Sequence, residues 1–125
     1  MSGEEGALVD DDESFGHQIV ETHARVAQVD RSWTEKVCAM AAARDGSLQV
    51  ALGVGKYTNR NVLDGYVGLS RGAEQVTVRG SRRLFPDPEV SAVGPIRYEV
   101  LEPMKRVRFS LEANDCQPLA FDWVY

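Results

Sequence analysis

The sequence predicts an all-β, antiparallel fold, and two features carry that prediction. Apolar and polar residues alternate across Ile96–Val100, directly after the turn signal Gly94-Pro95, and alternate again across Arg106–Leu111. A period of two is typical of a strand that buries one face. The second feature is a series of short apolar segments separated by turn signals such as Asp45-Gly46. Closely spaced strands joined by such turns indicate an antiparallel barrel or sandwich.

The elements follow in order from this pattern. We expect residues 1–14 to form an acidic, solvated arm. Residues 15–30 are expected to form a short helix or an irregular strap, because their apolar positions fit neither period. Strands are expected at residues 33–43, 47–57, 66–70, 74–84, 96–112 and 119–125. The fifth of these is one strand bent at Pro103. Turns and loops are expected at residues 45–46, 58–61, 64–65, 71–72, 85–89 and 114–115, where Gly, Pro, Asn and Asp gather.

The chain length predicts a single β domain over residues 15–125, preceded by the arm. The domain is expected to form a strongly curved sheet with a set of inward side chains. These are Val37, Val50, Val78, Tyr98, Val100, Phe109 and Leu111.

Charge and composition exclude several classes of protein. The formal net charge of −5 arises in the arm: residues 1–24 contain seven acidic residues and no Lys or Arg, and the rest of the chain is slightly basic. A nucleic-acid-binding protein would show a dominant stripe of basic residues, and this sequence has none. We therefore expect no nucleic-acid partner. The acidic start is unlike a signal peptide, and no apolar run is long enough to span a membrane. We therefore expect a cytoplasmic protein.

No cofactor or metal is expected. Cys38 and Cys116 lack motif spacing, and His17 and His23 lack the spacing of paired metal ligands. The segment Gly53-Val54-Gly55-Lys56 lacks the full phosphate-loop pattern and is interpreted as a curved strand. The basic cluster of Arg79, Arg82 and Arg83 is interpreted as a solvated edge strand, the alternative being a site for a carboxylate or phosphate group.

Seven short motifs resemble one known family. They are Trp33-Thr34-Glu35, Gly53 to Asn59 (GVGKYTN), Asp64-Gly65, Arg79 to Leu84 (RGSRRL), Val93-Gly94-Pro95, Glu99 to Pro103 (EVLEP) and Phe121-Asp122. Together they resemble the first half of the AttH-like proteins, which are related to hydroxyneurosporene synthase (carotenoid 1,2-hydratase). The resemblance covers roughly residues 10–125 and implies a lipocalin-like β-barrel, or one half of a two-barrel unit. It also implies a hydrophobic, isoprenoid-like ligand.

Two carboxylates are candidate catalytic residues. Hydration or cyclisation of an isoprenoid begins with protonation, which requires a carboxylic acid kept neutral by burial. Asp122 lies between Phe121 and Trp123, and Glu35 shares a strand face with Trp33. Either acid could instead lie on a solvated face. The acidic run Asp10 to Glu13 is a further proton source, or simply part of the arm.

Aromatic residues supply the candidate ligand-binding set. Its members are Trp33, Tyr57, Tyr98, Phe109 and Trp123. Three functions therefore stay open: a module that binds a hydrophobic small molecule, an acid-initiated hydratase, cyclase or isomerase, and a structural subunit completed by another chain. The apolar end of the sequence, Phe121 to Tyr125, together with the open edges of a half-barrel, predicts a homodimer or a partner chain that supplies the second half.

Overall fold

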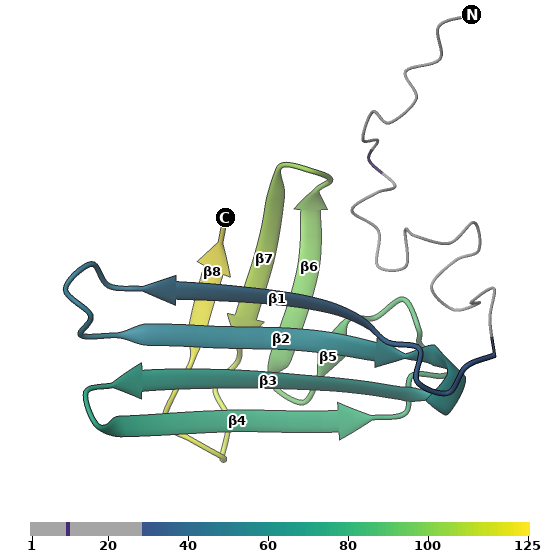
Figure 1. The fold of residues 1–125 in the computed structure, drawn as a ribbon, viewed down its shortest axis with the longest axis horizontal. Coiled ribbons are helices and arrows are strands. Elements are labelled where there is room, and N and C mark those ends of the chain that lie inside the picture. Colours follow the sequence, from purple (N-terminus) through teal and green to yellow (C-terminus); the bar gives the residue numbers. More distant parts are fainter. Residues whose placement is uncertain (1–9, 11–28) are drawn as a thin grey trace, which may run out of the picture.

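The computed structural model describes Asp10 and residues 29–125, and in this part the chain is an antiparallel all-β fold of two four-stranded sheets (Figure 1). Sheet A has the order β1-β2-β3-β4 and sheet B the order β5-β6-β7-β8. The strands of sheet A are β1 (Glu35–Ala42), β2 (Gln49–Tyr57), β3 (Val62–Arg71) and β4 (Glu74–Arg82). Those of sheet B are β5 (Ala92–Val93), β6 (Ile96–Glu102), β7 (Arg106–Leu111) and β8 (Phe121–Val124). The antiparallel fold class predicted from the sequence is confirmed.

Several predictions concern residues outside this range. The acidic arm, apart from Asp10, lies outside the described residues, as do His17, His23 and residues 15–28 of the expected strap.

Sheet A is a meander whose turns contain residues that tolerate a positive φ. The β1–β2 hairpin contains Gly46 and the β3–β4 hairpin contains Gly72, both with positive φ, where a side chain would be strained. Between β2 and β3 lies the short 3₁₀ helix η2 (Thr58–Arg60), which ends at Asn61 in the left-handed region. The hairpins predicted at residues 45–46 and 71–72 are therefore confirmed.

The turn predicted at Asp64-Gly65 is wrong, because β3 runs straight through it. Asp64 pairs with Gly55 of β2 in the ladder. Gly65 is needed for packing rather than for a turn: a Cβ there would lie 2.9 Å from Cγ1 of Val93. Gly80 lies opposite Gly65 on β4 and faces the same valine. These two glycines let sheet B approach sheet A closely.

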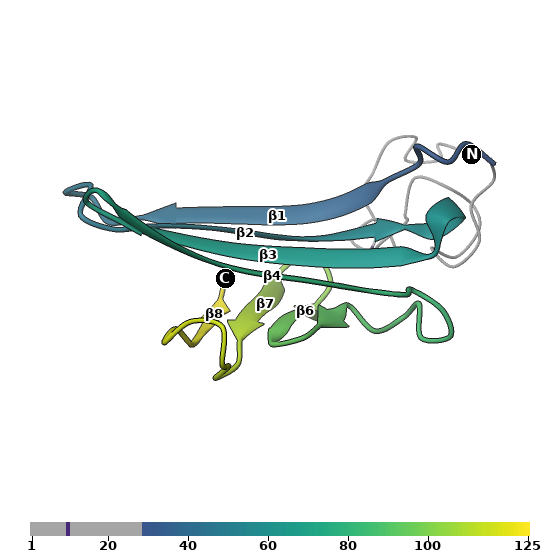
Figure 2. The ribbon, with the colours of Figure 1, turned by 90° about the horizontal axis from the view of Figure 1, so that it is seen from below.

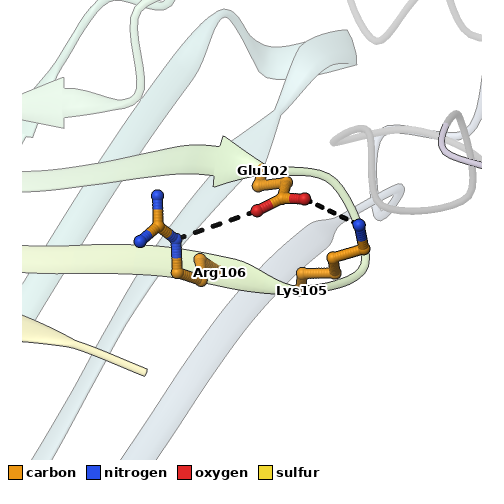
Figure 3. Close-up of polar contacts among 3 residues, drawn as sticks. All are labelled: Glu102, Lys105 and Arg106. Atoms are coloured by element: carbon orange, nitrogen blue, oxygen red, sulfur yellow. Dashed lines mark hydrogen bonds and ion pairs between the residues drawn. The ribbon is translucent and has the colours of Figure 1, made fainter.

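The bent strand predicted over residues 96–112 is also wrong, because it is a hairpin of β6 and β7. Pro103 cannot donate to a ladder, and Met104 adopts a positive φ of 60°, so the chain reverses here. The Lys105 amide donates to the Glu102 carbonyl at 3.0 Å. The Glu102 carboxylate also pairs with Lys105 Nζ at 2.7 Å and with Arg106 Nε at 3.9 Å (Figure 3).

The two sheets pack face to face, with the strands of sheet B crossing those of sheet A at a steep angle (Figures 1 and 2). The inner faces enclose the hydrophobic core, which contributes most of the stabilisation that apolar burial provides. Its members are Leu52, Val54, Leu63, Val67, Val78, Leu84, Val93, Ile96, Tyr98, Val107, Phe109 and Leu111. The described residues do not close into a single barrel.

Six of the seven predicted inward residues contribute to this core. Val78, Tyr98, Phe109 and Leu111 are buried, and Val37 and Val50 are partly buried against them. Val100 is the exception, since its side chain is 38% exposed although it pairs with the buried Val107. It lies near the end of β6, where the pairing becomes irregular and where β6 and β7 extend past β1 (Figure 1).

In the described part of the chain, no helix has the length and apolar character needed to cross a membrane.

Candidate functional site

Four paired residues, three of them charged, form a row across the inner face at one end of sheet A. In the ladder, Glu35 of β1 pairs with Lys56 of β2, Lys56 with Leu63 of β3, and Leu63 with Arg82 of β4. Residues directly opposite one another in an antiparallel sheet share a face. Lys56 also follows the core residues Leu52 and Val54 at intervals of two. The charged side chains of this row therefore lie on the same face as the core.

Lys56 is the buried charge of the row, with only 1% of its surface exposed. Its Nζ donates to the carbonyl of Pro88 at 2.8 Å. Burial lowers the pKa of Lys56 to about 8, because an ammonium loses its hydration in the interior. The negative charges of Glu89 and Glu35 act in the opposite direction, and the guanidinium of Arg82 adds to the lowering.

Arg82 fixes the loop that covers this end of the sheet, residues 83–91. Its guanidinium donates five hydrogen bonds to backbone carbonyls, at 2.5 to 3.2 Å. The accepting carbonyls belong to Arg83, Leu84, Asp87, Val90 and Ala92. The planar, five-donor guanidinium suits this role, because an irregular loop has carbonyls without ladder partners. With the Pro88 carbonyl held by Lys56, two inward cations anchor the loop, which we call the capping loop.

The chemistry that this arrangement would support is that of an amine. A lysine is a nucleophile or a base only in its neutral form, and burial is the usual means of making that form accessible near neutral pH. Glu35 and Glu89 are close enough for their charges to act on Lys56, so they could accept or return a proton. A strongly perturbed lysine with charged neighbours is typical of a functional site.

The two predicted catalytic carboxylates lie on different sheets, one on an inner face and the other on an outer face. Glu35 lies on the inner face beside Lys56. Asp122 lies on the outer face of sheet B, where its Oδ1 is 3.1 Å from Arg108 Nε and its side chain is 62% exposed. Arg108 also pairs with Glu99 at 3.7 Å, so this face is a ladder of alternating charges. The structure therefore does not bring the two carboxylates together.

An open hollow of about 660 Å³ lies over that charged outer face. Asp122 and Arg108 are among its lining residues, together with Arg97 and Glu112, whose side chains are 3.6 Å apart. Paired charges facing water contribute little to stability and typically serve solubility.

The predicted ligand-binding aromatics do not share one environment. Tyr98 and Phe109 belong to the core between the sheets, with ring centroids 4.9 Å apart. Trp123 is partly buried against the same core and lies 5.1 Å from the ring of Tyr125. Trp33 is half-buried just before β1.

Tyr57 is the member on the outside of sheet A. The ammonium of Lys36 lies 5.2 Å from its ring centroid and the guanidinium of Arg60 lies 5.8 Å from it. Tyr57 therefore makes cation–π contacts on the outer face, and it does not lie with the other four aromatics.

The sequence interpretation missed Lys56 and Arg82 as partners in one site. In the sequence, Lys56 belongs to a segment interpreted as a curved strand. Arg82 belongs to a basic cluster interpreted as a solvated edge strand. Of that cluster, Arg79 and Arg83 are exposed and Arg82 points inward to the capping loop. Counting by two from Leu52 would have placed Lys56 on the inner face, which is a usable signal.

The polar groups of the described residues suggest no metal centre. In the part of the chain that the structure describes, no three His, Cys, Asp or Glu side chains are grouped as metal ligands. Cys38 and Cys116 are both exposed, free thiols.

The fold and the charged row define a two-sheet antiparallel β module with a buried lysine under a fixed loop. Residues 9–124 match the model of a family of unknown function (DUF8625), and the chain belongs to that family. No curated protein and no solved structure matches the sequence.

Proposed function

We propose that this chain is a lipocalin-like half-barrel that binds a hydrophobic, isoprenoid-like small molecule on the open side between its sheets. The observation that carries the proposal is apolar surface on the inner face of sheet B. Val100 is 38% exposed and Tyr125 is 50% exposed. They flank the buried Val107, which pairs with Val100 and exchanges backbone hydrogen bonds with Tyr125.

The position of this surface supports binding between the sheets. The ends of β6, β7 and β8 extend past β1, the edge strand of sheet A (Figure 1). Val37 and Ala39 of β1 are only partly buried, so apolar side chains from both sheets border this side. Ligand pockets in β folds combine such apolar walls with few polar groups, and burial of apolar area supplies the affinity.

An enzyme that protonates its ligand is the second candidate, and Glu35 favours it. Among the predicted acids, Glu35 lies on the inner face, next to a buried amine. A carboxyl group there would act on a ligand that reaches the charged end of the sheet. Asp122, exposed on the outer face, would require a ligand on the other side of sheet B.

A fluorescence titration tests the binding proposal. Farnesol, a fifteen-carbon isoprenoid alcohol, should change the emission of Trp123 and Trp33 saturably, whereas a short alcohol such as propanol should not. Val100→Asp should weaken farnesol binding about 10-fold or more, because a charge would be placed against the apolar ligand. The matched control is Val124→Asp. Val124 is also exposed, but it pairs with Arg108 and so lies on the outer face of sheet B, away from the proposed site.

A signal that does not saturate, or equal affinity in both variants, would reject a ligand site on this side. Sedimentation of the same samples examines the predicted homodimer: dimers of the wild type that dissociate in Val100→Asp, without any ligand response, would support the structural-subunit function instead.

A further inference from the structure

Lys56 differs from the other lysines of the chain, which number two. Lys36 lies over the ring of Tyr57 on the outer face of sheet A. Lys105 pairs with Glu102 at the β6–β7 hairpin (Figure 3), and its side chain is 71% exposed. Lys56 alone of the three lies on the inner face and is buried. Its amine is therefore the one that lies on the side of sheet A that faces sheet B.

Lys56 has apolar neighbours within sheet A, and the charged group to which it belongs has equal numbers of positive and negative charges. Its ladder partner Leu63 and its strand neighbour Val54 are both core residues. Two carboxylates, Glu35 and Glu89, and two cations, Lys56 and Arg82, form the charged group. An anionic ligand would leave this group with an excess negative charge in the interior. A neutral ligand would not, so the electrostatics favour a neutral electrophile over a fatty acid or a phosphate.

We propose that Lys56 is a covalent ligand-binding residue that forms a Schiff base with an apolar aldehyde. The inference rests on the proposed binding of a hydrophobic molecule between the sheets, and it specifies the chemical class of that molecule. Glu35 and Glu89 act as the proton acceptors and then as counter-ions of the iminium.

The reaction balances without any further reagent. A carboxylate takes a proton from the Lys56 ammonium, and the freed lone pair on Nζ forms a bond to the carbonyl carbon of the aldehyde. The oxygen of the resulting carbinolamine receives a proton and leaves as water while a C=N bond forms. The products are one iminium cation and one water molecule, so the charge is the same before and after.

Two physical features make the amine suitable. Because burial lowers the pKa of Lys56 to about 8, a substantial fraction is neutral at pH 8, whereas an exposed lysine is almost wholly charged. The Pro88 carbonyl that holds Nζ belongs to the capping loop, whose neighbouring residues Glu89 and Val90 are exposed. The group that accepts the hydrogen bond of Nζ therefore belongs to an exposed loop and not to a sheet.

Reductive trapping on the full chain tests the proposal. The protein is incubated at pH 7 and pH 8 with farnesal, the aldehyde matching farnesol, and sodium cyanoborohydride, and the modified residue is located by peptide mass spectrometry. We expect the adduct on Lys56 to form about 10-fold or more faster than on Lys36 or Lys105, given its lower pKa. Lys56→Met should lose the fast adduct, and Lys105→Arg should keep it.

The outcomes separate this inference from the proposed function. If farnesol binds saturably and farnesal gives no preferential adduct at Lys56, the covalent role is rejected and the binding function stands. Equal labelling of all three lysines also rejects it. If neither compound binds and no adduct forms, both proposals fail. Because the wild-type peptide map alone gives the site preference, the test does not depend on whether Lys56→Met folds.

Discussion

Raising the pH should stabilise this protein through Lys56, and the size of the effect follows from the structure. The side chain is 1% exposed and its pKa is lowered from 10.5 to about 8 in the folded state. Between these values the unfolded chain holds the proton and the folded chain does not. Unfolding then takes up a proton, so the free energy of unfolding rises with pH. The interval is about 2.5 pH units, and each unit corresponds to ~1.4 kcal/mol, giving about 3 kcal/mol in total.

The assay is urea denaturation followed by circular dichroism at pH 7, 9 and 10.5, for the wild type and for Lys56→Met. Other groups titrate in this range, but they are present in both proteins and cancel in the difference. We expect the wild type to gain about 3 kcal/mol relative to Lys56→Met across the range. The control is Lys105→Met, an exposed lysine, for which the difference should stay flat.

A constant difference between the wild type and Lys56→Met from pH 7 to pH 10.5 would contradict the lowered pKa of Lys56. It would mean that the amine keeps its ordinary pKa, either because water reaches it or because Glu35 and Glu89 compensate fully for its burial. A difference that falls with pH would mean that the ion pairs outweigh burial, and that the pKa is raised.

Three further predictions concern the loop, the sheet contact and the outer face. Arg82→Gln should destabilise the fold by about 2–4 kcal/mol and increase amide exchange in residues 83–91, because loop carbonyls lose their donors, whereas Arg79→Gln on the outer face of β4 should change little. Gly65→Ala should cost about 1–3 kcal/mol in thermal or urea unfolding, since its Cβ would lie within 2.9 Å of a buried valine. Gly68→Ala on the same strand, with no heavy atom nearer than 3.9 Å, should be tolerated, and equal costs would contradict the close sheet contact. Asp122→Asn should leave farnesol affinity unchanged and lower stability by less than about 1 kcal/mol; a large loss of affinity would place the ligand on the outer face instead.

Much of the secondary structure could be predicted from local patterns alone. The hairpin turns at Gly46 and Gly72 were predictable because positive φ at a tight turn favours glycine. The core positions Tyr98, Phe109 and Leu111 followed from the period of two. These features depend on the residue itself and its immediate neighbours, which a sequence displays directly.

Asp64-Gly65 shows where local reasoning failed. The dipeptide favours a turn, but its glycine lies in β3 beneath Val93, a residue 28 positions further along the chain. The requirement for a small residue there comes from the other sheet. The prediction of one bent strand over residues 96–112 was wrong for a related reason. Apolar and polar residues alternate on both sides of Pro103 whether the chain bends or reverses. Pairing between β6 and β7 decides which of the two occurs.

The candidate site was decided by tertiary structure. Local patterns establish an antiparallel β chain and place acids, aromatics and Lys56 along its strands. Which face each strand turned inward, and which strands became neighbours, placed Lys56 beside Glu35 and beneath Pro88, and placed Asp122 in water beside Arg108. The physical reason is that burial and charge pairing act through space. The pKa of an amine depends on what surrounds it, and those surroundings come from four separate parts of the chain.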